Sequence, residues 1–148
     1  MRETLLTATC TLRAPLAEVA ALLIAVEAGP VGPTNAWLVD RGVGGATLAG
    51  GPTLFDYASP EGTGTLEVEP GRSIRYTGGW WYRATYTLFE DGPWTRVELR
   101  VDNAAAQPAW IVRSFNPGWR DVLQNGEQQF ERRMRDAARR LDCEVDFA

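Results

Sequence analysis

Two residue types are missing from this 148-residue chain: it has no histidine, and all fifteen of its basic residues are arginine. The lack of histidine excludes Ser-His-Asp and Cys-His nucleophilic systems and histidine metal sites. The lack of lysine excludes Schiff-base chemistry. The glycine-rich segment 42–51 lacks the Lys and Ser/Thr that follow a phosphate-binding P-loop. Any catalysis must therefore use Asp, Glu, Tyr, Arg or backbone groups, and we expect no cofactor and no metal.

Concentrated positive charge and long apolar runs are also absent. The net charge is −4 and the arginines are scattered except near the C-terminus, so we expect no nucleic-acid partner. No apolar run reaches the roughly 18 residues that a membrane helix needs. The N-terminal residues alternate, unlike a signal peptide, and we expect a cytoplasmic protein. Two cysteines, Cys10 and Cys143, are too few for a disulfide framework; we interpret them as free thiols, with a disulfide as the alternative.

The chain begins with a predicted strand and a short predicted helix. Residues 4–12 alternate between threonines and apolar side chains, which is typical of a half-buried strand. The apolar face of this strand consists of Leu6, Ala8, Cys10 and Leu12. Pro15 suits the first position of an amphipathic helix that we expect to run to about Ala28, with Gly29 as its C-cap.

Residues 31–60 are harder to interpret because glycine and proline dominate them. The segments "AWLVD" and "TLFDYA" each predict a short strand. If Phe55 and Tyr57 point inward, Asp56 is solvated, and a one-residue shift would bury it. Asp40 and Asp56 are the carboxylates that we consider as buried acids or bases.

The segment from Gly64 to Asn103 predicts consecutive antiparallel strands joined by tight turns. The turns are "EPGR" and "EDGP", and Gly78 and Gly79 end a strand that contains Tyr76. In the second hairpin, placing Glu90 opposite Pro93 puts both apolar sets on one face. The pairs are then Tyr86 with Val97, Ala84 with Leu99, Tyr82 with Val101 and, on the other face, Arg83 with Arg100. Trp80 and Trp81 fall on opposite faces.

The last predicted element is an amphipathic helix of about six turns. Asn116 and Pro117 fit an N-cap followed by the first helical residue. Apolar or small residues then recur every three or four positions. This stripe is Trp119, Leu123, Gly126, Phe130, Met134, Ala137 and Leu141.

The order of these elements resembles a known superfamily. "TCTLRAPLAEVAALL" at residues 9–23 is similar to the opening strand and helix of START/Bet v 1-like (SRPBCC) proteins, and "EVEPGRSIRYTG", "YTLFEDGPWTRVELRVD" and the C-terminal helix fit the rest. The family's usual second short helix has no counterpart in residues 30–60. The resemblance implies one α+β domain over residues 1–148, with β-α-β(n)-α order. In this helix-grip fold, a curved antiparallel sheet wraps around the long C-terminal helix and encloses a cavity.

Candidate site residues follow from the face assignments and from the cavity that the resemblance implies. Tyr82 and Tyr86 face inward, either as core rings with their hydroxyls bonded to backbone or as a cavity wall that orients a ligand or donates a proton. With Arg113, whose alternative is a surface salt bridge, they are the candidate catalytic residues. Gly126 serves either close helix packing or ligand space. The candidate ligand-binding set is Trp37, Tyr57, Tyr76, Tyr82, Tyr86, Leu99, Trp110, Phe115, Trp119, Leu123, Gly126 and Phe130.

Three functions fit these observations. The first is binding of a small hydrophobic molecule, aromatic or polycyclic, since SRPBCC proteins bind lipids, sterols or polyketides. The second is a cofactor-independent enzyme of the polyketide cyclase/aromatase type, acting by substrate folding and Tyr/Arg acid–base assistance. The third is a structural or partner-binding module with a filled cavity. We expect a monomer or a homodimer.

Overall fold

A computed structural model describes residues 3–42, 44–115 and 118–147, with only the backbone at positions 113 and 115. Nine strands form one antiparallel sheet in the order β2-β3-β4-β5-β6-β7-β8-β1-β9. The bounds of the strands are β1 Glu3–Leu12, β2 Gly29–Pro30, β3 Thr47–Gly50, β4 Leu54–Ser59, β5 Gly62–Glu69, β6 Ser73–Gly78, β7 Tyr82–Asp91, β8 Trp94–Asn103 and β9 Val145–Phe147. The helical elements are α1 Leu16–Leu23, the 3-10 turn η1 Trp37–Val39, α2 Ala109–Phe115 and α3 Gly118–Leu141.

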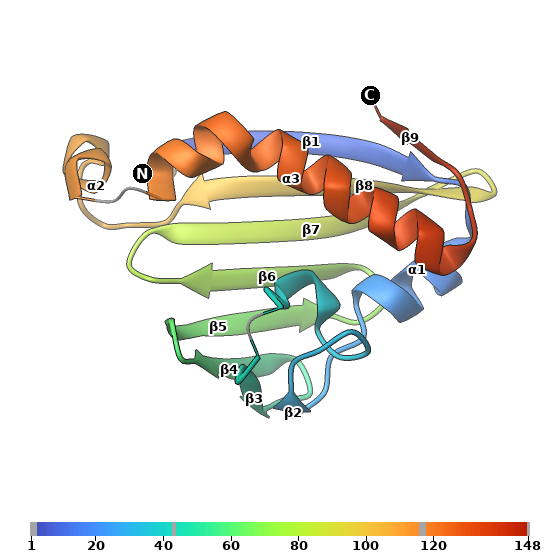
Figure 1. The fold of residues 1–148 in the computed structure, drawn as a ribbon, viewed down its shortest axis with the longest axis horizontal. Helices are drawn as coiled ribbons and strands as arrows, with labels where there is room; N and C mark the ends of the chain where they lie inside the picture. Colours follow the sequence, from blue (N-terminus) through green and yellow to red (C-terminus); the bar gives the residue numbers. More distant parts are fainter. Residues whose placement is uncertain (1–2, 43, 116–117, 148) are drawn as a thin grey trace.

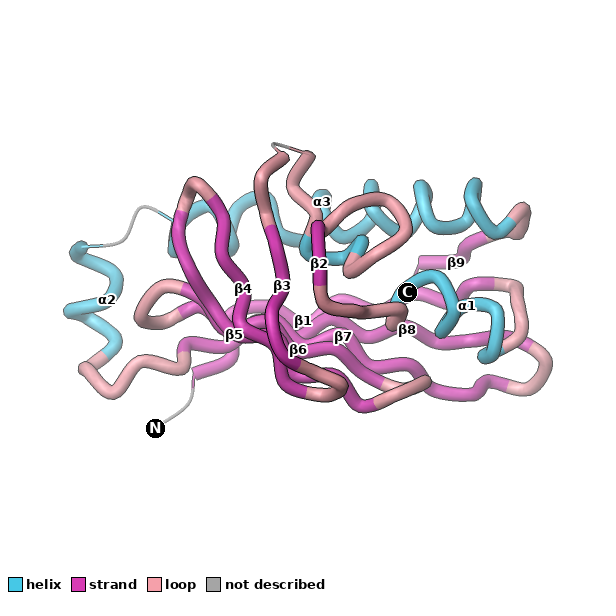
Figure 2. Tube along the Cα trace, turned by 90° about the horizontal axis from the view of Figure 1, so that it is seen from below, coloured by secondary structure: helices cyan, strands magenta, loops and turns pink. Residues whose placement is uncertain are grey.

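The long helix α3 lies across one face of this sheet (Figure 1). Strands β2, β3 and β4 bend toward the side on which α3 lies, so the sheet wraps around the helix (Figure 2). The helix-grip α+β fold that the resemblance predicted is therefore confirmed. In the described part of the chain, no helix is both long enough and apolar enough to span a membrane.

Alternating side chains explain why the sheet has one buried face. Ala8, Cys10 and Leu12 on β1 are buried, as the sequence predicted. On β4, Phe55 and Tyr57 are buried and Asp56 is exposed, which settles the face of that strand. Both cysteines are free thiols, and burial raises the pKa of Cys10 to about 12.

The helix predicted over residues 15–28 is shorter than expected. Pro15 is its N-cap, with ψ 149°, rather than its first helical residue, and the helix ends at Leu23. Beyond it, Asn35 accepts a hydrogen bond from the Glu27 N–H at 2.8 Å and donates to the Glu27 carbonyl at 3.0 Å. These hydrogen bonds replace helical ones. The predicted C-cap Gly29 instead begins β2.

The segment "AWLVD" is not a strand, contrary to the prediction. Ala36 adopts a left-handed conformation with φ 52°, and the chain then forms the 3-10 turn η1. The prediction for "TLFDYA" is confirmed as β4, whereas the short strands β2, β3 and β9 were not predicted. Of the two adjacent tryptophans, Trp81 is buried and Trp80 is 44% exposed, in agreement with their predicted opposite faces.

The register of the β7–β8 hairpin differs from the prediction by two residues. Tyr86 pairs with Leu99, Ala84 with Val101, Tyr82 with Asn103 and Arg83 with Asp102. The turn consists of only Gly92 and Pro93, because Gly92 has the positive φ, 60°, that a tight hairpin needs. A shift of two preserves every face, so the tyrosines still point inward, and the unfavourable Arg83–Arg100 pair does not form.

Helix α3 buries most of its predicted stripe against the sheet. Trp119, Phe130, Met134 and Ala137 are buried, whereas Leu123 is 57% exposed and is a wrong prediction. Val122 packs against the core in its place, because the buried face runs from 119 through 122 and 126 to 130. The N-cap and first-residue predictions at Asn116 and Pro117 lie outside the described residues.

Candidate functional site

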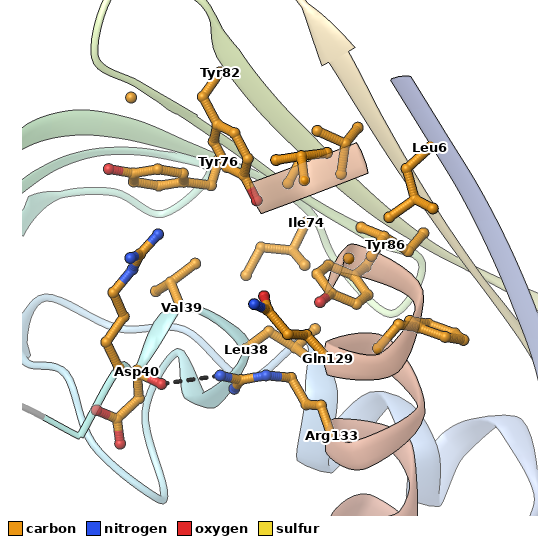
Figure 3. Close-up of a pocket in the computed structure, with 18 of the residues that line it drawn as sticks. Leu6, Leu38, Val39, Asp40, Ile74, Tyr76, Tyr82, Tyr86, Gln129 and Arg133 are labelled. Carbon is orange, nitrogen blue, oxygen red and sulfur yellow. Dashed lines mark hydrogen bonds between the residues drawn. The ribbon is translucent and has the colours of Figure 1, made fainter. Parts of the chain in front are cut away.

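A cavity of about 970 Å³ lies between the sheet, helix α3 and the segment that follows η1 (Figure 3). Its walls include apolar side chains from the centre of the sheet, among them Leu6, Ile74, Ala84, Leu99 and Val101. Several other lining residues are exposed, so the cavity opens to solvent. A cavity of this volume means that the groove is not filled by the protein's own side chains.

All four tyrosines of the chain line this cavity: Tyr57, Tyr76, Tyr82 and Tyr86. Three of the rings are in sequence, with Tyr57 edge-on to Tyr76 at 5.2 Å between centroids and Tyr76 at 6.2 Å from Tyr82, and together with Tyr86 we call them the tyrosine wall. Tyr86 stacks on Phe130 of α3 at 6.4 Å. The wall therefore extends from β4 across the sheet to the helix.

The tyrosine hydroxyls are not used to hold the fold together. Within residues 3–42, 44–115 and 118–147, none of the four donates a hydrogen bond to a protein acceptor, and no inaccessible side-chain oxygen or nitrogen lacks a partner. Each hydroxyl therefore keeps some surface that is accessible to solvent. Figure 3 shows those of Tyr82 and Tyr86 pointing into the same space as the Gln129 side chain.

Two glycines make room for the Tyr76 ring. Gly64 on β5 and Gly78 on β6 are paired across the strands, between Tyr57 on one side and Tyr82 on the other. A Cβ at Gly64 would lie 2.9 Å from the Tyr76 hydroxyl oxygen, and one at Gly78 would overlap the same ring. Tyr76 thus lies across this glycine pair instead of projecting into the cavity.

Burial keeps the inner tyrosines protonated. It raises the pKa of Tyr86, and it raises the pKa of Tyr82 and Tyr76 in the same direction. Positive charge opposes this effect: Arg133 lowers the pKa of Tyr82 and Tyr86, and Arg41 lowers that of Tyr76 and Tyr82. At neutral pH the hydroxyls are therefore hydrogen-bond donors and weak acids, not bases.

Two arginines of α3 fix the segment that covers one side of the cavity. Arg133 donates to the backbone carbonyls of Trp37 at 2.8 Å and Asp40 at 3.1 Å, and Arg140 donates to that of Pro33 at 2.5 Å. Both guanidinium groups also lie over the Trp37 ring, at 5.3 and 5.1 Å. Figure 3 shows the Arg133–Asp40 contact below the cavity.

Eight of the predicted ligand-binding residues line the cavity. They are Trp37, Tyr57, Tyr76, Tyr82, Tyr86, Leu99, Gly126 and Phe130. At Gly126 the structure shows close packing as well, because a Cβ there would lie 2.7 Å from the Leu6 Cδ2 atom. Their role in binding a ligand stays a prediction.

The remaining predicted residues lie elsewhere. Trp110 on α2 is 67% exposed, and Trp119 packs with Trp81 at 5.4 Å in a second, smaller core. The side chains of Arg113 and Phe115 lie outside the described residues. Helix α2 sits at the end of the molecule (Figure 1), and none of its described side chains lines the cavity, because the chain after β8 continues away from the sheet.

Several cavity residues were missed from the sequence. Leu38 and Val39 come from the segment that we predicted as a strand, Arg41 directly follows it, and Gln129 and Arg133 come from α3. The sequence does carry a signal for Arg133, because it lies next to Met134 at the edge of the buried stripe of the helix. It also lies seven residues, or about two helical turns, before Arg140, so both arginines are on the same side of the helix. Asp40, which we considered as a buried acid or base, lines the cavity but is only half-buried, and its carboxylate accepts from the Gly42 N–H at 2.9 Å. No three His, Cys, Asp or Glu side chains of the described residues are placed to hold a metal ion.

Comparison with solved structures gives a similarity of fold. No family model matches the chain, and no curated protein does. Among solved structures, the chain is similar to the solution NMR structure of the Polyketide_cyc-like protein Cgl2372 from Corynebacterium glutamicum, with 12% sequence identity and a TM-score of 0.46. The similarity covers 95% of this chain and 91% of that one. The case for a function rests on the cavity itself.

Proposed function

We propose that the protein binds a small hydrophobic molecule, aromatic or polycyclic, in the cavity between the sheet and α3. The observation that carries this proposal is an unfilled cavity of about 970 Å³ that gathers every tyrosine of the chain, with hydroxyls not bonded to protein within the described residues. Ligand pockets are typically apolar clefts of ~300–1,000 Å³ with a few polar groups that orient the guest.

The energetics favour a flat apolar guest. Each Å² of apolar ligand surface removed from water contributes about 25 cal/mol, and ring-to-ring contacts with tyrosines add about 0.5–1.5 kcal/mol each. The protonated hydroxyls of Tyr82 and Tyr86 then donate to oxygen atoms of the guest. A neutral ring system with oxygen substituents meets both conditions. We also keep as predictions a single domain, a monomeric or homodimeric state and a cytoplasmic location.

A cavity-filling variant tests the proposal. Ala84 is buried, lines the cavity and faces Tyr76 and Val101 across the strands. Ala84→Leu adds three carbons to the cavity, so the affinity for a neutral fluorescent guest, N-phenyl-1-naphthylamine, is expected to fall about ten-fold or more. Ala58→Leu is the matched control, because Ala58 is exposed and lies outside the cavity lining.

The proposal fails if the wild type binds no such guest, or if both variants bind it as well as the wild type does. Circular dichroism of both variants confirms that each is folded. Native mass spectrometry of freshly purified protein provides an independent measurement, since a co-purifying molecule would be lost from the Ala84→Leu variant.

A cofactor-independent enzyme of the polyketide cyclase/aromatase type is the second candidate. The observation that favours it is that two protonated hydroxyls, Tyr82 and Tyr86, face one space beside the positive charge of Arg133. A protonated tyrosine hydroxyl can donate a proton to an enolate oxygen, and a nearby positive charge can stabilise that oxygen. Arg113 was the arginine predicted as a catalytic residue, and its side chain lies outside the described residues. Arg133 is the arginine that lies beside the two hydroxyls in the structure.

Turnover distinguishes the two candidates. If Tyr82→Phe and Tyr86→Phe keep their affinity for a polyketide-like ligand but lose its conversion, the protein is an enzyme. If the wild type converts none of the ligands that it binds, the enzyme candidate is rejected and the binding function stands.

A further inference from the structure

The cavity is lined by more arginines than aspartates, and few of these charges form ion pairs with one another. Four arginines line it, Arg41, Arg132, Arg133 and Arg139, together with three aspartates, Asp40, Asp121 and Asp136. Within the described residues, only Asp136 is paired with a cation, whereas Asp121 and Asp40 accept hydrogen bonds from neutral donors and keep their negative charge. Asp136 pairs with Arg139 at 2.9 Å, Asp121 accepts from Asn125 at 2.8 Å, and Asp40 accepts from the Gly42 N–H.

The arginines nearest the tyrosine wall therefore have no carboxylate. Among the described residues, neither Arg41 nor Arg133 forms an ion pair. Arg133 donates to two neutral carbonyls and lies over the Trp37 ring, which leaves three of its five N–H groups free and its charge without a carboxylate of the described residues. Arg41 makes no hydrogen bond to the described part of the chain and lines the cavity with an exposed side chain.

This charge reaches the interior of the cavity. Arg41 and Arg133 both lower the pKa of the Tyr82 hydroxyl, against the opposing charge of Asp121, and they come from two adjoining elements, one after η1 and the other on α3. In a chain whose net charge is −4, a cavity lined by four arginines and three aspartates has a local excess of positive charge that does not reflect composition. The oxygen atoms of a neutral guest can accept from these arginines, whereas an acidic group also compensates their charge and forms the stronger, charge-assisted hydrogen bonds.

We propose that the guest is an amphipathic anion, whose ring system lies against the tyrosine wall and whose acidic group sits on the side of Arg41 and Arg133. The inference deepens the proposed function and rests on it. It narrows the ligand class from hydrophobic molecules in general to aromatic or polycyclic acids.

Two probes with the same ring skeleton test the proposal. N-phenyl-1-naphthylamine is neutral, and 8-anilinonaphthalene-1-sulfonate carries the same rings and one sulfonate. The wild type is expected to bind the sulfonate about ten-fold more tightly than the neutral amine, by fluorescence titration at low salt. The sulfonate is expected to displace the amine, and its affinity alone is expected to fall as NaCl is raised.

Arg41→Gln removes one cation without disturbing a contact of the described residues. We expect it to weaken sulfonate binding about three- to ten-fold and amine binding less than two-fold. The matched control is Arg72→Gln in the β5–β6 turn, an exposed arginine outside the cavity, which changes the net charge equally and is expected to leave both affinities unchanged. Ala84→Leu is expected to weaken both probes, which places them in the cavity.

The outcomes separate this inference from the proposed function. If the amine binds in the cavity and the sulfonate binds no more tightly, the anionic ligand is rejected while the binding function stands. The same holds if Arg41→Gln and Arg72→Gln have equal effects. If neither probe binds, or if Ala84→Leu leaves both unaffected, the binding function fails and this inference fails with it.

Discussion

Replacing Gly78 by alanine is expected to destabilise the protein through one side chain, Tyr76. The three atoms nearest to a Cβ built at Gly78 all belong to the Tyr76 ring. Gly78 does not have a left-handed φ, so alanine brings no backbone strain there. The ring must therefore move toward the cavity and lose its edge-on contact with Tyr57.

The magnitude of this destabilisation follows from three contributions, two that lower the free energy of unfolding and one that raises it. Overpacking costs about 1–3 kcal/mol, and the lost ring contact about 0.5–1.5 kcal/mol. Alanine in place of glycine inside a strand returns about 0.5–1 kcal/mol by restricting the unfolded chain. Gly78→Ala should therefore lower the free energy of unfolding by about 0.5–4 kcal/mol. In a Tyr76→Ala background, where the ring is gone, the same substitution should raise it by about 0.5 kcal/mol.

Urea unfolding of the four proteins in this cycle, followed by circular dichroism, measures the change of sign. Gly64→Ala is the control. Its Cβ would lie 2.6 Å from the Thr77 carbonyl oxygen as well as near the Tyr76 ring, so truncating Tyr76 cannot relieve it. If Gly78→Ala destabilises the Tyr76→Ala background as much as the wild type, the ring is not the cause and our account of the glycine pair is wrong.

Two further predictions concern the arginine contacts and the buried tyrosine. Arg133→Met should lose the hydrogen bonds to the Trp37 and Asp40 carbonyls. Hydrogen exchange of the backbone amides of residues 36–42 should then accelerate by about ten-fold or more, which corresponds to a fall of about 1.4 kcal/mol or more in the free energy of local opening. Unchanged exchange would contradict the role of Arg133. Burial raises the folded-state pKa of Tyr86 above its ordinary value of 10, so the unfolded chain loses the proton first and stability falls as the pH rises above 10. Tyr86→Phe lacks this contribution and should lose less stability between pH 10 and pH 11, measured by urea unfolding; a parallel loss in both proteins would show that Tyr86 does not titrate as described.

Alternation and helical periodicity predicted the fold well where one face is buried and the other is wet. Residues on β1 and β7 fell on their predicted faces, even though the β7–β8 register differs by two. Shifting one strand by two residues leaves every side chain on the same face, so an alternating pattern cannot distinguish the two registers. The position of the turn at Gly92 sets the register of β7 and β8. The inward tyrosines were therefore predictable although their partners were not.

The segment between α1 and β3 was not predictable in the same way. Its conformation depends on hydrogen bonds to distant residues, such as Arg133 with the carbonyls of Trp37 and Asp40. A carbonyl is present at every position, so the sequence carries no mark of which ones an arginine will bind. For this reason the arginine side of the cavity was missed, while its tyrosine side was found.

Arg133 and Arg140 bind backbone carbonyl oxygens and the indole ring of Trp37. This choice of partners limits which substitutions in the cavity wall would disturb their contacts. Backbone acceptors survive any exchange of side chain, so the partly buried Val39 can be replaced without removing the hydrogen bonds that hold its segment, whereas Leu38 also packs in the core. Under the proposed function, selectivity for differently shaped guests is expected to change with the side chain at position 39 while the backbone around it stays in place.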